Sequence, residues 1–467
     1  MGSRQAKLVR RALLKAGAAA PLAWAAAVRA EPPRRPNILF IMADDLGYAD
    51  LGCYGRRGVK TPNIDTLAAE GARFTQAYAN SAVCSASRTA IITGRYQYRT
   101  LVGLAEPIAT DDEDAAMRLP VGAPTLPGLF KAAGYRTSLI GKWHLAGGVE
   151  GPRRAGYDDF FGFHPGANDY FRRPTAKEAA VKDYQGAPLY ENETVVQPKG
   201  YLTDLLADAA IRRIEATRAA DPFFISLHFN APHWPWEGPG DEAKSITLKR
   251  LRDEDSGSTA IYALMVETMD RAIGRVLDCV ERTGRTRDTI VVFTSDNGGE
   301  RYSDTWPLTG MKGELLEGGI RVPAIVRWPG HVPGATLAQV AIGMDWMPTL
   351  MAAAGVSAPP AFKPDGENLL PVLTGVTPVH PRKLFWRYKA SEQAAVRDGE
   401  WKYLKLGGRE YLFNIAEDER ERADHKKLEP AILKRLKADY DEWNRGMLPY
   451  SLSTFSETPK DHFADRY

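Results

Sequence analysis

Short apolar runs alternate along the chain with stretches of helical periodicity. The clearest run covers residues 37–42, Asn-Ile-Leu-Phe-Ile-Met, and similar runs occupy 135–140, 222–229 and 289–293. Nearly continuous apolar runs of this length are typical of strands that are covered on both faces. Between the last two runs, apolar residues recur every three or four positions from Ile261 to Val280, which predicts an amphipathic helix. The alternation favours an α/β fold with a largely parallel sheet.

The pattern changes after about residue 375. Runs of strand character at 401–406 and 410–413 flank Gly407 and Gly408, which predicts a β-hairpin, and a charged helix follows over 430–443. We therefore expect a larger domain over 31–375 and a smaller α+β subdomain over 376–467.

Two stretches inside the larger domain, 175–199 and 234–258, are polar and aperiodic and contain Pro and Gly. Aperiodic stretches of this length are often functional loops. We expect long surface loops in both places.

The first thirty residues have the features of an export signal. The pair Arg10-Arg11 precedes an Ala-rich run over 12–28, and Val28-Arg29-Ala30 resembles a cleavage site. The arginine pair resembles a twin-arginine signal. The run is too short and too Ala-rich for a membrane span. The alternatives to a cleaved signal are a retained membrane anchor and a disordered tail. We expect residues 1–30 to be a signal peptide, and the protein to be exported to the periplasm or beyond without stable membrane insertion.

Composition excludes a disordered chain, a collagen-like protein and a disulfide-rich scaffold. Of the 467 residues, 44% are hydrophobic and 25% are charged, which is usual for globular proteins. Removing the six basic residues of the first thirty leaves 55 basic against 58 acidic residues, so a nucleic-acid partner is not expected. The only cysteines are Cys53, Cys84 and Cys279, an odd number that rules out a disulfide framework. A Cys53–Cys279 bridge stays open.

Polar side chains follow each predicted strand of the large domain. In chain order they are Asp44 and Asp45, Lys142 and His144, His233, and Asp296 and Asn297. Ligands of open α/β sheets bind beyond the carboxyl ends of the strands, so we expect these groups to form one site. The oxygen-rich members, the three aspartates and Asn297, suit Ca²⁺ or Mg²⁺. The alternative for an isolated Asp-Asp pair is a helix cap or a solvated surface.

Cys84 lies where small residues indicate a turn that opens into a helix. Backbone N–H groups favour negative charge at that position, and Arg88 adds a cation one turn later. Cys84 on its own could be a small buried hydrophobe. It could also be a thiolate nucleophile with His144 or His233 as its base.

Residues 84–94, Cys-Ser-Ala-Ser-Arg-Thr-Ala-Ile-Ile-Thr-Gly, resemble the sulfatase signature C-x-[P/A]-S-R-x-x-x-x-T-G. In that family the cysteine is oxidised to Cα-formylglycine. Further matching motifs lie at 43–48, 141–145, 231–233, 294–298, 312–313 and 317–323. The resemblance implies an alkaline-phosphatase-like fold, in which helices sandwich a large mixed, mostly parallel sheet and a smaller α+β subdomain ends the chain. It also implies a sulfuric ester hydrolase.

The resemblance implies a role for each matching residue. Cys84, oxidised by a formylglycine-generating maturation enzyme, would be the nucleophile and a metal ligand. Arg88 would hold the hydrated aldehyde, and Lys142 and Lys312 would bind sulfate. His144 would be the base and His233 the acid for the leaving group. The ion, Ca²⁺ or alternatively Mg²⁺, would be held by Asp44, Asp45, Asp296 and Asn297 together with position 84.

The substrate is less clearly indicated. Export and family together favour a sulfated glycan over a small sulfated metabolite, and thus a role in polysaccharide degradation. Trp234 and Trp236 could stack on a sugar or anchor their loop to the core. The alternatives are a phosphate or phosphonate monoester hydrolase of the same superfamily and a non-catalytic protein that binds sulfated glycans. The full set of candidate catalytic residues argues against the non-catalytic alternative.

Overall fold

The computed structural model describes residues 35–108, 118–120, 122–179, 186–248, 250–252 and 256–458. The expected signal peptide, 1–30, lies outside the described residues. None of the helices in the described part of the chain is both long and apolar enough to cross a membrane.

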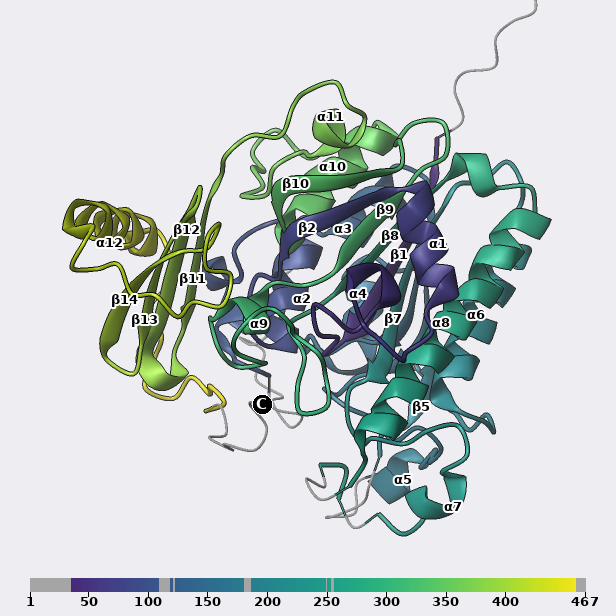
Figure 1. Ribbon diagram of the computed structural model, residues 1–467. Helices are drawn as coiled ribbons and strands as arrows, with labels where there is room; N and C mark the ends of the chain where they lie inside the picture. Colours follow the sequence, from purple (N-terminus) through teal and green to yellow (C-terminus); the bar gives the residue numbers. More distant parts are fainter. Residues whose placement is uncertain are drawn as a thin grey trace, which may run out of the picture. The chain divides into compact units, whose positions relative to one another are not determined.

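The larger of two sheets has ten strands in the order β10-β2-β9-β8-β1-β7-β3-β4-β5-β6 (Figure 1). In chain order its strands are β1 (Asn37–Asp44), β2 (Ala72–Tyr78), β3 (Arg136–Lys142), β4 (Asp159–Phe163), β5 (Leu189–Glu191), β6 (Thr194–Val196), β7 (Phe223–Pro232), β8 (Thr289–Ser295), β9 (Ala324–Arg327) and β10 (Ala335–Ile342). The four strands expected from the apolar runs are β1, β3, β7 and β8. They are neighbours and parallel, with β1 between β7 and β8, which confirms the expectation.

Helices cover both faces of this sheet because side chains alternate along its strands. Leu39 and Ile41 of β1 pack in one cluster with α1 (Pro62–Glu70), α6 (Leu202–Ala216) and α8 (Thr259–Arg282). The helix expected around 261–280 is α8, so that prediction is confirmed.

Ile38, Phe40 and Met42 of β1 point to the opposite face. The helices there are α2 (Cys84–Thr93), α3 (Leu126–Ala132) and α10 (Trp346–Ala354). Burial on both faces explains why the central strand is apolar at nearly every position. The remaining short helices are α4 (Gly151–Arg154), α5 (Ala176–Ala179), α7 (Glu242–Ser245), α9 (Glu317–Ile320) and α11 (Leu370–Leu373).

The prediction of a long surface loop over 175–199 is wrong in part. Its described residues include α5 and the strands β5 and β6, which form an antiparallel hairpin at the edge of the sheet. Each strand has three residues, too few for a recognisable period of two. The expected loop over 234–258 contains the short helix α7 and is otherwise irregular where it is described.

The second sheet is antiparallel, in the order β11-β12-β13-β14. Its strands are β11 (Lys383–Tyr388), β12 (Gln393–Asp398), β13 (Trp401–Leu406) and β14 (Arg409–Asn414), and α12 (Pro430–Arg445) packs against it through Leu436. Leu406 pairs with Arg409, so Gly407 and Gly408 form a two-residue turn with φ of 57° and 76°. Both angles suit glycine in a hairpin turn. The predicted hairpin and terminal helix are confirmed.

A buried chain of charged and polar groups joins the second sheet to the first. Lys402 of β13 has no exposed surface, and its Nζ lies 2.9 Å from Glu317 Oε1 on α9 and 2.9 Å from Glu421 Oε1. The hydroxyl of Tyr78, on β2, donates to Glu317 Oε2 at 2.7 Å and accepts from Arg397 Nη1, on β12, at 2.7 Å. The end of β2 is thereby tied to the second sheet.

Gly141 precedes Lys142 on β3 and has no room for a side chain. Its φ is 108°, and a Cβ would lie 1.8 Å from the carbonyl oxygen of His228 on β7. We expect Gly141→Ala to lower the free energy of unfolding by about 3 kcal/mol or more, because backbone must move. Urea unfolding measures the loss.

Gly408→Ala is the matched control for that variant. Gly408 also has positive φ, but a Cβ there meets nothing within 4 Å. Only the left-handed backbone is penalised, by about 1–2 kcal/mol. Equal losses in the two variants would contradict the close contact between β3 and β7.

Candidate active site

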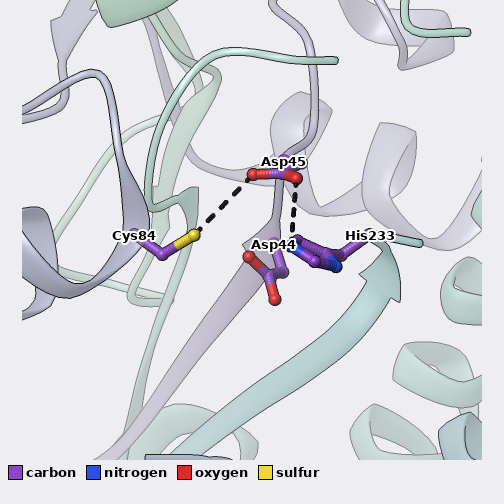
Figure 2. Close-up of side chains that lie close together, drawn as sticks. All are labelled: Asp44, Asp45, Cys84 and His233. Atoms are coloured by element: carbon purple, nitrogen blue, oxygen red, sulfur yellow. Dashed lines mark hydrogen bonds and ion pairs between the residues drawn. The ribbon is translucent and has the colours of Figure 1, made fainter. Parts of the chain in front are cut away.

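Four side chains from three segments meet at the carboxyl end of the large sheet (Figure 2). Asp44 ends β1 and Asp45 follows it, Cys84 begins α2, and His233 follows β7. One ligand atom from each lies within 4.8 Å of all the others, and all four residues are buried. The ends of β1 and β7 and the start of α2 therefore converge, as part of the site that the strand ends predict.

Asp45 is at the centre of the site. Its Oδ1 accepts from Asn297 Nδ2 at 2.7 Å, and its Oδ2 lies 2.7 Å from Lys312 Nζ and 3.5 Å from His233 Nε2. The sulfur of Cys84 lies 3.9 Å from Oδ1. Asp45 has φ of 62°, an uncommon conformation for a residue other than glycine and one that tends to occur at functional sites.

Arg88 and Lys142 are each paired with a buried carboxylate. Arg88 binds Asp296 Oδ2 through Nε at 2.9 Å and Nη2 at 2.8 Å, and its Nη1 donates to the carbonyl of Lys142 at 3.1 Å. Lys142 Nζ lies 2.6 Å from Asp44 Oδ2. With Lys312 on Asp45, each of the three cationic residues predicted for the site contacts one of the three aspartates.

The paired cations do not fully offset the effect of burial on Asp44. Burial raises the pKa of Asp44 to about 8, with Lys142 opposing the shift and Asp296 and Asp45 adding to it. Asp44 Oδ1 and Asn297 Oδ1 are buried and accept no hydrogen bond from the described residues. Buried acceptors normally have partners, and carboxylate and amide oxygens are the ligands that hard divalent cations prefer. The residues present therefore fit a divalent metal.

Backbone carbonyls hold both candidate histidines in one tautomer. His144 Nε2 lies 3.2 Å from the carbonyl oxygen of Ile108, and His233 Nδ1 lies 2.7 Å from that of Trp234. A carbonyl oxygen only accepts, so the nitrogen facing it carries the proton. The other nitrogens are His144 Nδ1, which is buried without a hydrogen-bond partner, and His233 Nε2, which faces Asp45.

Both rings are held neutral in the free site. Burial lowers the pKa of His144 well below its usual value, and the charges of Lys142 and Arg88 lower it further. Burial likewise lowers the pKa of His233, with Lys312 and Lys142 adding to the shift. A neutral imidazole with one fixed N–H has a lone pair at its second nitrogen, as proton transfer requires.

The thiol of Cys84 lacks the features of an activated thiolate. It is 2% exposed, and burial raises its pKa well above the usual value although Lys142 and Lys312 oppose the shift. A thiolate nucleophile needs nearby positive charge to outweigh the effect of burial, so that the pKa of the thiol falls. Cys53 and Cys279 are both free, so the bridge left open by the sequence is not formed.

The two tryptophans after His233 have different environments. Trp236 is 7% exposed and packs in the core with its ring 4.8 Å from that of Tyr302, as the loop-anchoring alternative requires. Trp234 is half-buried, and its ring lies 4.4 Å from the ring of His233. Its indole Nε1 is buried and has no hydrogen-bond partner among the described residues.

Sequence reasoning missed several groups that build the site. Ile108 orients His144 through a backbone carbonyl, which no side-chain pattern marks. Glu300 Oε2 lies 3.7 Å from Lys312 Nζ, and Arg252 Nη2 lies 3.3 Å from Glu300 Oε1. Glu300 was the easier of these to find, because it follows the Asp296-Asn297 motif by three residues.

Comparison with known proteins gives consistent matches. A family model described as Sulfatase matches residues 36–356. Arylsulfatase A of Homo sapiens is 33% identical over 413 residues, which cover 83% of this chain and 78% of that protein. A solved structure of Ps i-CgsB in complex with k-i-k-neocarrahexaose is 32% identical, with a TM-score of 0.80, and covers 91% of this chain and 96% of that chain.

A phosphonate monoester hydrolase of Agrobacterium radiobacter shares the fold at lower similarity. It is 22% identical, with a TM-score of 0.61, over 87% of this chain and 94% of that chain. The alkaline-phosphatase-like architecture expected from the motifs is thus found in proteins of both chemistries.

Proposed function

The chain belongs to the sulfatase family and hydrolyses sulfate esters, and from that premise we propose a formylglycine-dependent reaction on a sulfated carbohydrate. The observation that carries the proposal is the convergence of Asp44, Asp45, Cys84 and His233 within 4.8 Å at the end of the large sheet. Arg88, Lys142 and Lys312 pair with the aspartates of the site. The charges of Lys142 and Arg88 lower the pKa of His144.

Position 84 requires modification for turnover. A thiol that attacked sulfur would form a thiosulfate ester and trap the enzyme, and the thiol of Cys84 is buried with a raised pKa. A hydrated formylglycine supplies one hydroxyl to attack sulfur and a second whose deprotonation releases sulfate. A formylglycine-generating maturation enzyme is therefore a required partner.

Asp44, Asp45, Asp296 and Asn297, with position 84, would hold the metal ion. We assign Ca²⁺, with Mg²⁺ as the alternative, because the four side chains offer only oxygen ligands. When bound, the ion supplies Lewis-acid stabilisation of negative charge on a sulfate oxygen and on the attacking hydroxyl.

The cationic side chains are fixed before substrate arrives. A hydrogen bond and an ion-pair contact to Asp296, with a hydrogen bond to the Lys142 carbonyl, fix the orientation of Arg88 beside position 84. Lys142 and Lys312, held by Asp44 and Asp45, bind the non-bridging oxygens of sulfate. Charges held in place in this way stabilise the transition state without reorganisation.

The two histidines move the protons. His144, with its proton fixed on Nε2 by Ile108, uses the lone pair of Nδ1 to accept a proton from position 84. His233, with its proton fixed on Nδ1 by Trp234, would take a proton from water at Nε2 and pass it to the leaving oxygen, while Asp296 would accept the proton of the attacking hydroxyl. Acid–base assistance of this kind contributes about 10²–10⁴-fold in rate.

A sulfated glycan is the substrate class that these features support. Ps i-CgsB, which is 32% identical, was solved with an oligosaccharide. The partnerless indole N–H of Trp234, next to His233, can donate to a sugar oxygen of the leaving group. Residues 1–30 would direct export to the periplasm or the extracellular space, 31–375 would form the catalytic domain, and 376–467 the C-terminal subdomain.

The state of position 84 tests the proposed mechanism. We expect mass spectrometry of the peptide containing Cys84, from protein made with a formylglycine-generating enzyme, to show the aldehyde or its hydrate. Turnover of a sulfate ester should exceed that of the matched phosphate ester, and Cys84→Ala should abolish turnover while the protein stays folded. An intact thiol throughout fully active protein would exclude formylglycine, and faster phosphate turnover would favour the phosphatase alternative.

Chelation tests the metal site. Because buried carboxylates repel one another, Ca²⁺ should raise Tm, and a concentration 100-fold above Kd corresponds to about 2.7 kcal/mol of stabilisation. EDTA should reverse the increase and abolish turnover. Asp296→Asn should lose most of the Ca²⁺-dependent shift, whereas Asp221→Asn, at an exposed pair with Arg218, should keep it. Identical shifts in the two variants would place the ion elsewhere.

Leaving-group dependence tests the role of His233. Without a proton donor, departure of a sugar alkoxide is slowed more than departure of a stabilised phenolate, so His233→Ala should lower kcat by about 10²–10⁴-fold on sugar sulfates. The loss on aryl sulfates should be clearly smaller. His331→Ala, at an exposed ring stacked on Trp328, is the control and should leave both rates unchanged. Equal losses on both substrates would contradict the acid role.

A further inference from the structure

Glu106 is a buried carboxylate that the proposed mechanism does not use. It has no exposed surface, and its Oε1 accepts a hydrogen bond from the Tyr450 hydroxyl at 2.5 Å. Its Oε2 accepts from the Ser456 hydroxyl at 2.9 Å and from the backbone N–H of Lys389 at 2.9 Å. A buried carboxylate is stabilised only by such donors, so the contacts are specific.

The backbone of Glu106 also pairs with the segment that supplies these donors. The N–H of Glu106 donates to the carbonyl of Phe455 at 3.1 Å, and its carbonyl accepts from the N–H of Glu457 at 2.6 Å. The hydroxyl of Tyr388, on β11, donates to the carbonyl of Glu457 at 2.8 Å. Residues 450–457 are thus attached along one side to Glu106 and along the other to β11.

One route leads from this segment to His144. Two residues after Glu106, the N–H of Ile108 donates to Ser85 Oγ at 2.8 Å, next to position 84. The carbonyl of Ile108 accepts the Nε2–H of His144. Glu106 therefore holds the short piece of backbone that sets the tautomer and the orientation of this ring.

A second route leads from the same segment to His233. The carboxylate of Glu457 forms an ion pair with Arg252 Nη1, and Arg252 also contacts Glu300. The Cζ of Arg252 lies 5.7 Å from the centre of the Trp234 ring. Trp234 in turn packs against the His233 ring and accepts its Nδ1–H.

We propose that residues 450–457 are a positioning segment for the acid–base step, acting on His144 through Glu106 and on His233 through Arg252. The inference rests on the proposed function, since it concerns the two histidines of that mechanism. Neither Glu106 nor Glu457 needs to touch substrate. Small displacements of a reacting group cost about 10²-fold in rate, so loss of these contacts should be visible in kcat.

Two substitutions separate the routes. Glu106→Gln keeps the side-chain shape but removes the negative charge that strengthens the hydrogen bonds from Tyr450, Ser456 and the Lys389 N–H. It should lower kcat by about 10-fold or more, equally on aryl and sugar sulfates. Glu457→Gln weakens the pairing with Arg252 and should lower kcat more on sugar sulfates, because His233 serves the leaving group. KM, the Ca²⁺-dependent shift in Tm and the aldehyde content at position 84 should stay the same in both variants.

Further variants keep the test decisive. Tyr450→Phe removes one donor to Glu106 and should show the Glu106→Gln effect in weaker form, even if Glu106→Gln folds poorly. Glu417→Gln, an exposed glutamate of the same subdomain, should change nothing. Unchanged kcat in both Glu106→Gln and Tyr450→Phe, or kcat losses that follow losses of Tm and metal affinity, would overturn the positioning role. Absence of sulfatase turnover in the wild-type chain, made with a formylglycine-generating enzyme, would instead overturn the proposed function.

Discussion

The site depends on burying three carboxylates close together without unfolding the sheet that holds them. Asp44, Asp45 and Asp296 are each at most 2% exposed, and each contacts at least one cationic side chain. Removing charges from water costs more than a single pairing returns unless geometry and further hydrogen bonds are favourable. The parallel strands supply part of that geometry, because their carboxyl ends bring the aspartates and Lys142 to one edge, where Arg88 on α2 and Lys312 meet them. What the pairing leaves unsatisfied among the described residues is two buried acceptors, Asp44 Oδ1 and Asn297 Oδ1.

Much of this arrangement could be predicted from the sequence because it follows from strand ends. The apolar runs before Asp44, Lys142 and His233 marked buried strands, and parallel strands of one sheet end on the same side. Lys312 follows no predicted strand and was identified only from its resemblance to a family motif. Its pairing with Asp45 places it in the candidate site, as the motif predicts. Its role in binding sulfate stays a prediction.

The rest could not be predicted because it depends on backbone groups and distant packing. The carbonyls of Ile108 and Trp234 select the histidine tautomers, yet a carbonyl is present at every residue. Glu106 and Arg252 act between segments hundreds of residues apart, a separation that no local pattern encodes. The hairpin of β5 and β6 was missed because its strands are too short to show a period of two. For Trp236 the sequence allowed either stacking on a sugar or anchoring of the loop, and the residue is buried in the core.

The buried chain from Lys402 through Glu317 and Tyr78 to Arg397 bears on how the molecule melts. Detachment of the second sheet would break the contacts of Lys402 with Glu317 and of Arg397 with Tyr78, and any of these groups that stayed buried would lose its partner. We therefore expect the smaller sheet, which reads along the chain as an appendage, to melt together with the larger one.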